Sequence, residues 1–238
     1  MSAIGDAVLY LNDPLNWTRP RGILDLTGQH LQIAGLSLGI GLLIGVPIAV
    51  WLGHTGRGGG LAVGLVNISR AVPTLAILAI FAVTPIGFTV WAPVIALTVF
   101  AIPPILANTY VGFREVDRDV VEAARGMGMS GGQLLFRLEL PLAAPLILAG
   151  IRLAVVQVWA TATIAALVAG PGLGRIITLG FVRQDVAQVV AGALVVAGIA
   201  LAIEGVMALL QRVLDPVARH STGRQLSASR SLLGGART

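Results

Sequence analysis

Long apolar runs separated by polar connections constrain this chain more than any other feature. Five of them are long enough to cross a lipid bilayer, which takes about 20 apolar residues per helix. They lie at 31–52, within 61–84, within 91–109, at 142–169 and at 187–210. Because lipid offers no hydrogen bonds, the backbone groups of such runs must pair within helices. We therefore predict an all-α, polytopic membrane bundle of about five transmembrane helices.

The remaining segments suggest how the chain is divided. A sixth apolar piece, Arg175–Val182, is too short to span and follows a Gly-Pro-Gly turn, which predicts a re-entrant or interfacial segment. Residues 1–29 carry five charges and no sustained apolar core, so we expect an extracytoplasmic amphipathic lead-in and no signal peptide. Residues 30–213 form the predicted transmembrane domain. Residues 214–238 are expected to be a disordered cytoplasmic tail, with contact to anionic lipid as the alternative.

Composition excludes several kinds of site. The sequence is 56% hydrophobic and 11% charged, whereas soluble domains carry roughly 25% charged residues. It has no cysteine and three scattered histidines, so we expect no metal site and no cofactor. All 16 basic residues are arginines. Without lysine the chain cannot form a Walker A motif, and we expect a transport subunit without catalytic residues.

Arginine placement predicts the orientation. If the loop 110–141 is cytoplasmic, ten arginines lie inside and four lie outside, as the positive-inside rule requires. The four outside are Arg19, Arg21, Arg175 and Arg183. We therefore expect a multi-pass protein of the plasma or inner membrane, with its N-terminus outside and its C-terminus in the cytoplasm.

The loop 110–141 carries local signals of folded structure. Asp119 followed by Glu122 predicts a capped helix start, and Gly126 and Gly128 predict its end. Ser130 with Gln133 forms a capping box for a second helix, and a proline follows in the first turn of the next span. We predict two short helices joined by a glycine turn. Four apolar residues on them suit docking to another protein, with packing under the spans as the alternative: Met127, Met129, Leu134 and Phe136.

This loop resembles the signature loop of binding-protein-dependent ABC importer permeases. The signature is Glu-Ala-Ala, three residues, Gly, nine residues, Ile, one residue, Leu-Pro. The matching residues are Glu122, Ala123, Ala124, Gly128, Leu138 in place of Ile, Leu140 and Pro141. The resemblance implies a type I importer permease fold, in which this loop couples the pore to a separate ATPase. It also implies three partners: a dimer of ATPase subunits, a second permease subunit, identical or homologous, and an extracytoplasmic substrate-binding protein.

Three further stretches, 67–81, 101–117 and 149–177, resemble permeases for quaternary-ammonium compatible solutes. This similarity extends over roughly residues 28–215. It implies osmoprotectant uptake, with glycine betaine, choline, carnitine or proline betaine as the solute. An importer permease for another small solute, such as an amino acid, is the alternative.

Polar residues and prolines in the spans leave two interpretations each. Gln157 and Thr161 share a helix face and either line the translocation path or bond between helices. Pro103, with its neighbour Pro104, either bends the third span for gating or serves packing alone. Charges within apolar segments either pair and snorkel or contact substrate: Arg70, Arg152 and Glu204. The pairs Gly35–Gly39 and Gly41–Gly45 predict close helix packing.

Two other classes of membrane protein fit the sequence less well. A stand-alone secondary transporter or channel typically needs several intramembrane carboxylates or an internal repeat. Glu204 is the single acid within a predicted span, and no repeat is evident. A membrane enzyme needs an acid dyad, spaced histidines or a Ser-His pair, and the predicted spans show none of these.

Overall fold

A computed structural model describes residues 3–60, 64, 67, 73–168 and 170–214. Every regular element in these residues is a helix, which confirms the all-α class. In chain order they are α1 (Ala3–Asn12), α2 (Pro14–Thr18), α3 (Ile23–Thr55), α5 (Thr74–Ala82), the 3₁₀ helix η1 (Pro85–Phe88), α6 (Trp91–Arg114), α7 (Arg118–Gly126), α8 (Gly131–Leu134), the π-turn η2 (Leu135–Glu139), α9 (Leu140–Ala162), the 3₁₀ helix η3 (Ile164–Val168), α10 (Gly174–Arg183) and α11 (Val186–Leu214).

Four helical stretches of the described chain are long and apolar enough to cross a membrane. They are Pro14–Thr55, Trp91–Arg114, Gly131–Val168 and Val186–Leu214. These stretches confirm the first, third, fourth and fifth predicted spans. Much of the predicted second span, together with Arg70, lies outside the described residues, and α5 occupies the second half of that span.

The first long helix, α3, begins eight residues before the predicted start of its span. Ile23, Leu26 and His30 are buried in the bundle. The helix therefore already packs against the core over 23–30, a stretch that is more polar than the predicted span. Its 33 residues extend about 50 Å at 1.5 Å per residue, against a hydrocarbon core of about 30 Å. Helix α3 is therefore longer than the apolar layer is thick.

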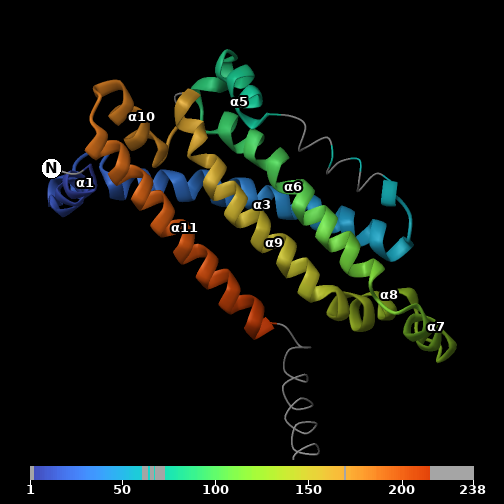
Figure 1. The fold of residues 1–238 in the computed structure, drawn as a ribbon. Helices are drawn as coiled ribbons and strands as arrows, with labels where there is room; N and C mark the ends of the chain where they lie inside the picture. The colour runs from blue at the N-terminus through green and yellow to red at the C-terminus, as the bar shows by residue number, and fades with distance from the viewer. Residues whose placement is uncertain (1–2, 61–63, 65–66, 68–72, 169, 215–238) are drawn as a thin grey trace, which may run out of the picture.

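Helix α6 packs closely on both α3 and α9 (Figure 1). A Cβ added to Gly41 would lie 3.1 Å from Ala101 Cβ, and one added to Gly45 would lie 3.3 Å from Ile105 Cγ2. The Gly41–Gly45 pair therefore allows α3 to approach α6, as predicted. The prediction is wrong for Gly35 and Gly39, because no described atom lies within 4 Å of a Cβ added there.

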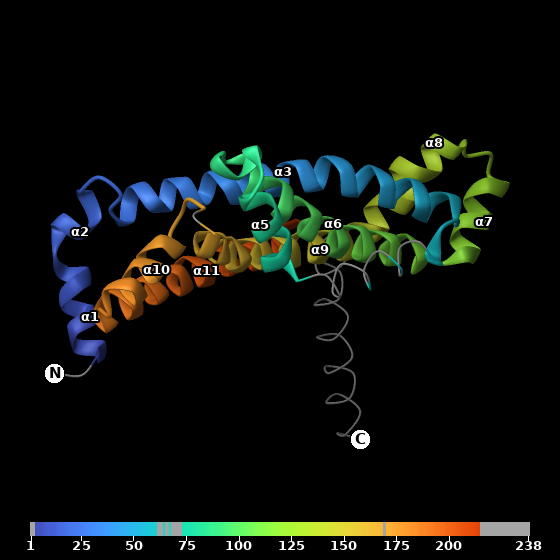
Figure 2. The same ribbon diagram turned by 90° about the horizontal axis from the view of Figure 1, so that it is seen from above.

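Helix α1 and the start of α11 lie side by side at one end of the bundle (Figures 1 and 2). Helices α1 and α2 fold back from the start of α3, and α1 packs against α11 (Figure 2). The predicted short segment is the helix α10, which also packs against α11. The loop that carries α7 and α8 lies at the opposite end (Figures 1 and 2).

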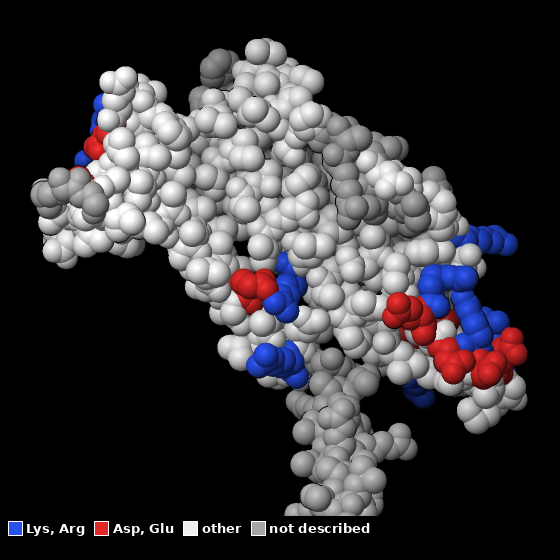
Figure 3. Space-filling model, viewed as in Figure 1, with Lys and Arg blue, Asp and Glu red and all other residues white. Residues whose placement is uncertain are grey.

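On the visible face, charged side chains gather at these two ends, and the mostly apolar surface between them carries a smaller charged group (Figure 3). Large apolar side chains on the four long stretches point outward, including Leu43, Val99, Leu153 and Leu201, whose exposed fractions lie between 48% and 78%. Such a surface would be a liability in water and suits contact with lipid.

Candidate functional site

The candidate site is the loop between α6 and α9, and its first element is the helix α7. The carboxylate of Asp117 accepts a 2.9 Å hydrogen bond from the N–H of Asp119, so the helix is capped at Asp117 and begins at Arg118. The predicted start at Asp119 is therefore two residues late. Glu122 lies one turn into the helix, with its side chain exposed.

The end of α7 confirms the predicted role of Gly128. The N–H of Met129 donates to the carbonyl of Ala124 at 3.2 Å, and the N–H of Gly128 donates to that of Arg125 at 2.9 Å. These two bonds form a Schellman motif, which requires a residue in the left-handed region. Gly128 supplies it with a φ of 84°, so this glycine fixes the direction in which the chain leaves α7.

The second element differs from the prediction of a separate short helix. The capping box is confirmed, because Ser130 and Gln133 exchange side-chain and backbone hydrogen bonds. However, α8 continues through the π-turn Leu135–Glu139 directly into α9. A π-turn inserts an extra residue into a helix and is frequent at functional sites. The second helix of the loop is thus the first part of the fourth span.

The loop has a small apolar core of its own. Val116, Val121, Ala124 and Leu134 are buried in it, and Met129 and Leu138 pack against it. The prediction that Leu134 is exposed is therefore wrong, and Met129 is half-buried. Self-packing explains both results, because α7 and α8 fold against one another.

Two of the apolar residues predicted for docking remain exposed. The exposed fraction is 79% for Met127 and 68% for Phe136. Together with Glu122 and Ala123 they form the outer surface of the loop, which we call the docking surface. The other signature residues are placed differently: Leu140 packs against the cluster of Phe113, Ala143 and Ile147, and Pro141 is exposed in the first turn of α9.

A polar contact that sequence reasoning missed ties this loop to α3. The imidazole Nδ1 of His54 is hydrogen-bonded to the carboxylate of Glu139. Glu139 is 5% exposed, and a buried carboxylate is costly unless it is paired. The two residues are 85 positions apart. A signal was available, since Glu139 is the one acid between Gln133 and the apolar α9.

The residues predicted for the translocation path lie on two neighbouring helices. Gln157 is half-buried and Thr161 is 9% exposed, both on α9, while Pro103 is buried in α6. Helix α6 runs without interruption through Pro103 and Pro104. Close by, Trp159 donates a 3.2 Å hydrogen bond from Nε1 to the carbonyl of Val196 on α11. This part of α9 therefore makes an interhelical bond, as one of the two interpretations of its polar residues requires.

The charges predicted within the spans do pair. Arg152 of α9 donates from Nε to Glu204 of α11 at 2.9 Å and from Nη1 to Gln211 at 3.1 Å. This group lines a groove of about 440 Å³ between the two helices. Among the described residues, no three His, Cys, Asp or Glu side chains gather as a metal site would require.

Comparisons with known proteins place the chain in a family. Residues 41–220 match the family described as binding-protein-dependent transport system inner membrane component. The chain is 34% identical over 208 residues to the glycine betaine/carnitine/choline transport system permease protein OpuCB of Bacillus subtilis, covering 87% of this chain and 95% of that protein. It is 36% identical over 194 residues to the choline transport system permease protein OpuBB of the same organism, covering 82% and 89%. It is also 30% identical over 221 residues to the osmoprotectant import permease protein OsmW of Salmonella typhimurium, covering 89% and 98%.

Solved structures share the fold at lower identity. The inward-facing MetNI methionine ABC transporter aligns with a TM-score of 0.69 and 19% identity, covering 85% of this chain and 99% of that one. An amino acid ABC transporter crystallised with histidines aligns with a TM-score of 0.65 and 17% identity, covering 90% and 98%. These likenesses confirm the type I importer permease fold. Fold and sequence together show that this multi-pass membrane chain belongs to the family of binding-protein-dependent transport system inner membrane components.

Proposed function

We propose that the chain is the permease subunit of an ATP-driven importer for a quaternary-ammonium compatible solute, and that it serves osmoprotectant uptake. The candidates are glycine betaine, choline, carnitine and proline betaine. The observation that carries the proposal is the identity of 30–36% to permeases named for such solutes, over most of both chains.

The experiment that tests the solute is uptake into proteoliposomes that hold the chain with its ATPase and binding protein. Labelled glycine betaine, choline, carnitine and proline betaine are compared with labelled methionine. We expect ATP-dependent uptake of one or more of the four ammonium compounds. Uptake of methionine alone would contradict the proposed solute class and would favour the amino acid importer.

The loop is proposed to couple the permease to the ATPase through the docking surface. Exposed Met127 and Phe136 offer adaptable apolar contacts on a rigid, capped support. Glu122 lies one turn into α7 as an exposed carboxylate, available to a cationic or amide partner. Ala123 shares this surface, whereas Ala124, Leu138 and Leu140 hold the loop together from within. Gly128 and Pro141 set the path of the backbone on either side.

Co-purification of the ATPase with variant permeases tests this coupling role. Glu122→Ala is expected to weaken ATPase association and to leave membrane insertion unchanged. Glu115→Ala is the matched control, because Glu115 is an exposed acid of the same loop outside the signature. Equal ATPase recovery with both variants would contradict a role for Glu122. The isolated chain is expected to bind no ATP, since it has no lysine for a phosphate loop.

The pore is proposed to form between two permease subunits, with an extracytoplasmic binding protein supplying the solute. Pro103, Gln157 and Thr161 are the proposed path residues, because they place a break in backbone bonding and two polar groups on adjacent inner helices. Gln157→Leu and Thr161→Val are expected to lower the uptake rate at unchanged ATPase association. Normal uptake by the double variant would remove these two residues from the path.

The proposed orientation has the loop and the C-terminus in the cytoplasm. The sequence has no cysteine, so single introduced cysteines report their own side of the membrane. Ile86→Cys in η1 is expected to react with an impermeant thiol reagent from outside, and Met127→Cys in the loop only after the membrane is opened. Both residues are exposed. Labelling of both from the same side would contradict this topology.

A further inference from the structure

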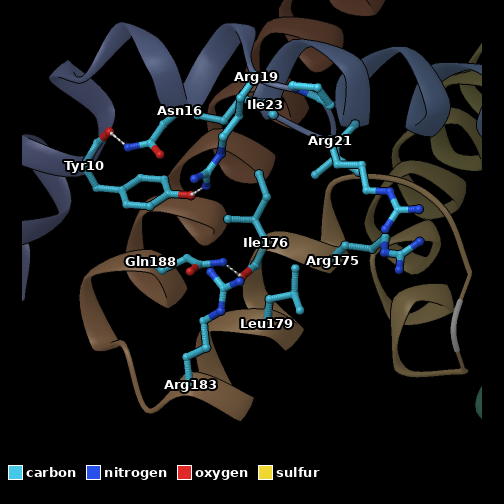
Figure 4. A pocket seen from close by; sticks show the side chains of 13 residues that line it. Tyr10, Asn16, Arg19, Arg21, Ile23, Arg175, Ile176, Leu179, Arg183 and Gln188 are labelled. Atoms are coloured by element: carbon cyan, nitrogen blue, oxygen red, sulfur yellow. Dashed lines mark hydrogen bonds between the residues drawn. The ribbon is translucent and has the colours of Figure 1, made fainter.

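Four arginines from two distant segments of the chain line one cavity at the end of the bundle opposite the loop. They are Arg19, Arg21, Arg175 and Arg183, the four that the sequence placed outside. The cavity has a volume of about 340 Å³ and lies between the start of α3, the helix α10 and the start of α11. Figure 4 shows that the four arginines come from two separate segments of the chain, with Arg21 and Arg175 beside each other on one side of the cavity and Arg19 and Arg183 on the other.

No acidic residue lines this cavity to balance the four positive charges. Arg19 donates from Nη2 to the hydroxyl of Tyr10 at 3.0 Å. The guanidinium groups of Arg21, Arg175 and Arg183 have no hydrogen-bond or ion-pair partner among the described residues. The two nearest carboxylates in sequence are engaged: Asp25 accepts from the backbone of Arg21 and from Gln29, and Asp185 caps the backbone of Gln188.

Like charges around one cavity, above all the neighbouring Arg21 and Arg175, repel each other unless an anion lies between them. Elsewhere in the described chain, the charges within the spans are paired, as Arg152 is with Glu204. Guanidinium groups bind phosphate by parallel hydrogen bonds from a planar fork. The cavity volume lies within the range of small-ligand pockets, roughly 300–1,000 Å³. Its charge and size therefore suit a phosphate group.

The surroundings of the cavity suit a ligand with an apolar part. Ile23, Leu26, Ile176 and Leu179 contribute apolar walls. The adjoining surface of α10 exposes Phe181 and Val182, by 65% and 81%. A phospholipid presents its phosphate beside apolar chains at the edge of the bilayer. Tyr10 at the rim is a residue type enriched at that level.

We propose that this cavity binds a phosphate-bearing anion through Arg21, Arg175 and Arg183. The ligand is the phosphate of an anionic phospholipid headgroup or a free phosphate anion from solution, two sources of the same chemistry. The site differs from the docking surface and from the proposed path, and it does not depend on which solute is transported.

Native mass spectrometry of the purified full chain tests the site. The chain is titrated in detergent with phosphatidylglycerol or phosphatidylcholine, and retained lipid is counted. We expect phosphatidylglycerol to be retained in preference to phosphatidylcholine. The variant Arg175→Gln/Arg183→Gln should bind phosphatidylglycerol about tenfold more weakly, the effect of losing roughly one charged hydrogen bond. Arg212→Gln, at the other end of α11 and outside the cavity, is the matched control and should bind normally.

A second arm separates the two sources. Inorganic phosphate that competes with the lipid and raises the melting temperature of wild type, but not of the double variant, identifies a free-anion site. Retention of phosphatidylglycerol that phosphate does not displace identifies a lipid site. Arg183→Gln alone, at an exposed position, provides the test if the double variant does not fold. Equal lipid binding by wild type and variants overturns the proposal. So does equal binding of the two lipids without any phosphate effect. Loss of binding-protein association with unchanged anion binding would assign these arginines to a protein interface and also overturns it.

Discussion

The two polar ends of the bundle are built in different ways. At the loop end, the caps, the Schellman motif and the small apolar core all join residues within 116–138. At the opposite end, the cavity and its surroundings join residues from Tyr10 to Gln188. Local bonding gives the loop a defined shape of its own, which suits its proposed role in coupling to the ATPase. Long-range packing makes the opposite end depend on the arrangement of the spans.

At each end, one histidine of α3 bonds to the neighbouring elements. The two histidines differ in burial and in number of partners, as the two ends differ in packing. His30 is fully buried and uses both ring nitrogens: Nδ1 accepts from the N–H of Leu173 at 3.3 Å, and Nε2 donates to the carbonyl of Trp159 at 3.0 Å. Gly172, with a φ of 106°, lies against this ring. His54 has a 26% exposed side chain and a single partner, Glu139. His30 therefore has both ring nitrogens fixed within the packing, whereas His54 has one partner at a partly exposed position.

Replacing Gly128 should give the largest functional effect, because it disrupts the backbone conformation that gives the loop its shape. In Gly128→Val a β-branched residue must occupy a left-handed conformation, which costs at least about 1–2 kcal/mol. We expect uptake and ATPase association to fall by about tenfold or more, with the spans still folded. Uptake in proteoliposomes and ATPase co-purification measure this effect.

Gly126→Val is the matched control for this variant. Gly126 lies two residues earlier, is exposed, and has ordinary helical φ with no atom within 4 Å of an added Cβ. Valine is a better helix former than glycine, so this variant should keep its activity. Similar loss with both variants would show that bulk at the docking surface, and not backbone conformation, is limiting.

Replacing His30 should give the largest effect on stability. His30→Leu leaves a buried N–H of Leu173 and a buried carbonyl of Trp159 without a partner, each costing about 1–3 kcal/mol. We expect a melting temperature clearly lower in detergent, with ATPase association unchanged in the folded fraction. Gln29→Leu serves as control, because the Gln29 side chain bonds only to the exposed Asp25. A His30→Leu protein as stable as wild type would contradict the role assigned to these two bonds.

The hydrogen bond between His54 and Glu139 should matter less for stability than the His30 bonds do, and more for transport. His54→Gln and Glu139→Gln are each expected to destabilise the fold by about 1 kcal/mol and to slow uptake. In a double-mutant cycle the two losses should not add, because each variant replaces one partner of the same hydrogen bond. Additive losses in uptake would show that the two residues act separately.

These regions also show which features sequence could predict. The spans followed from hydropathy and the α7 turn from Gly128, because both depend on near neighbours in the chain. The joining of α8 to α9, the burial of Leu134 and the His54–Glu139 bond depend on how α3, α6 and α9 meet. The four arginines of the cavity were identified individually, but their position around one cavity required the fold. The seven signature residues were located by their pattern, which could not show that some face outward while Ala124, Leu138 and Leu140 pack inward.

The middle of the bundle should give the smallest effect, if its charges serve mainly to cancel one another. Arg152 and Glu204 are 34% and 37% exposed at their side chains, so neither is locked in a buried network. The double variant Arg152→Gln/Glu204→Gln removes both charges and keeps hydrogen-bonding groups, and we expect uptake within about twofold of wild type. Each single variant leaves an unpaired charge in a span and should lower uptake and expression more than the double variant does. Arg212→Gln, on the same helix as Glu204, controls for loss of a positive charge near the end of α11. If uptake by the double variant fell as far as in either single variant, these charges would contact the solute or the second subunit. The middle of the bundle would then have specific polar partners, as its two ends do.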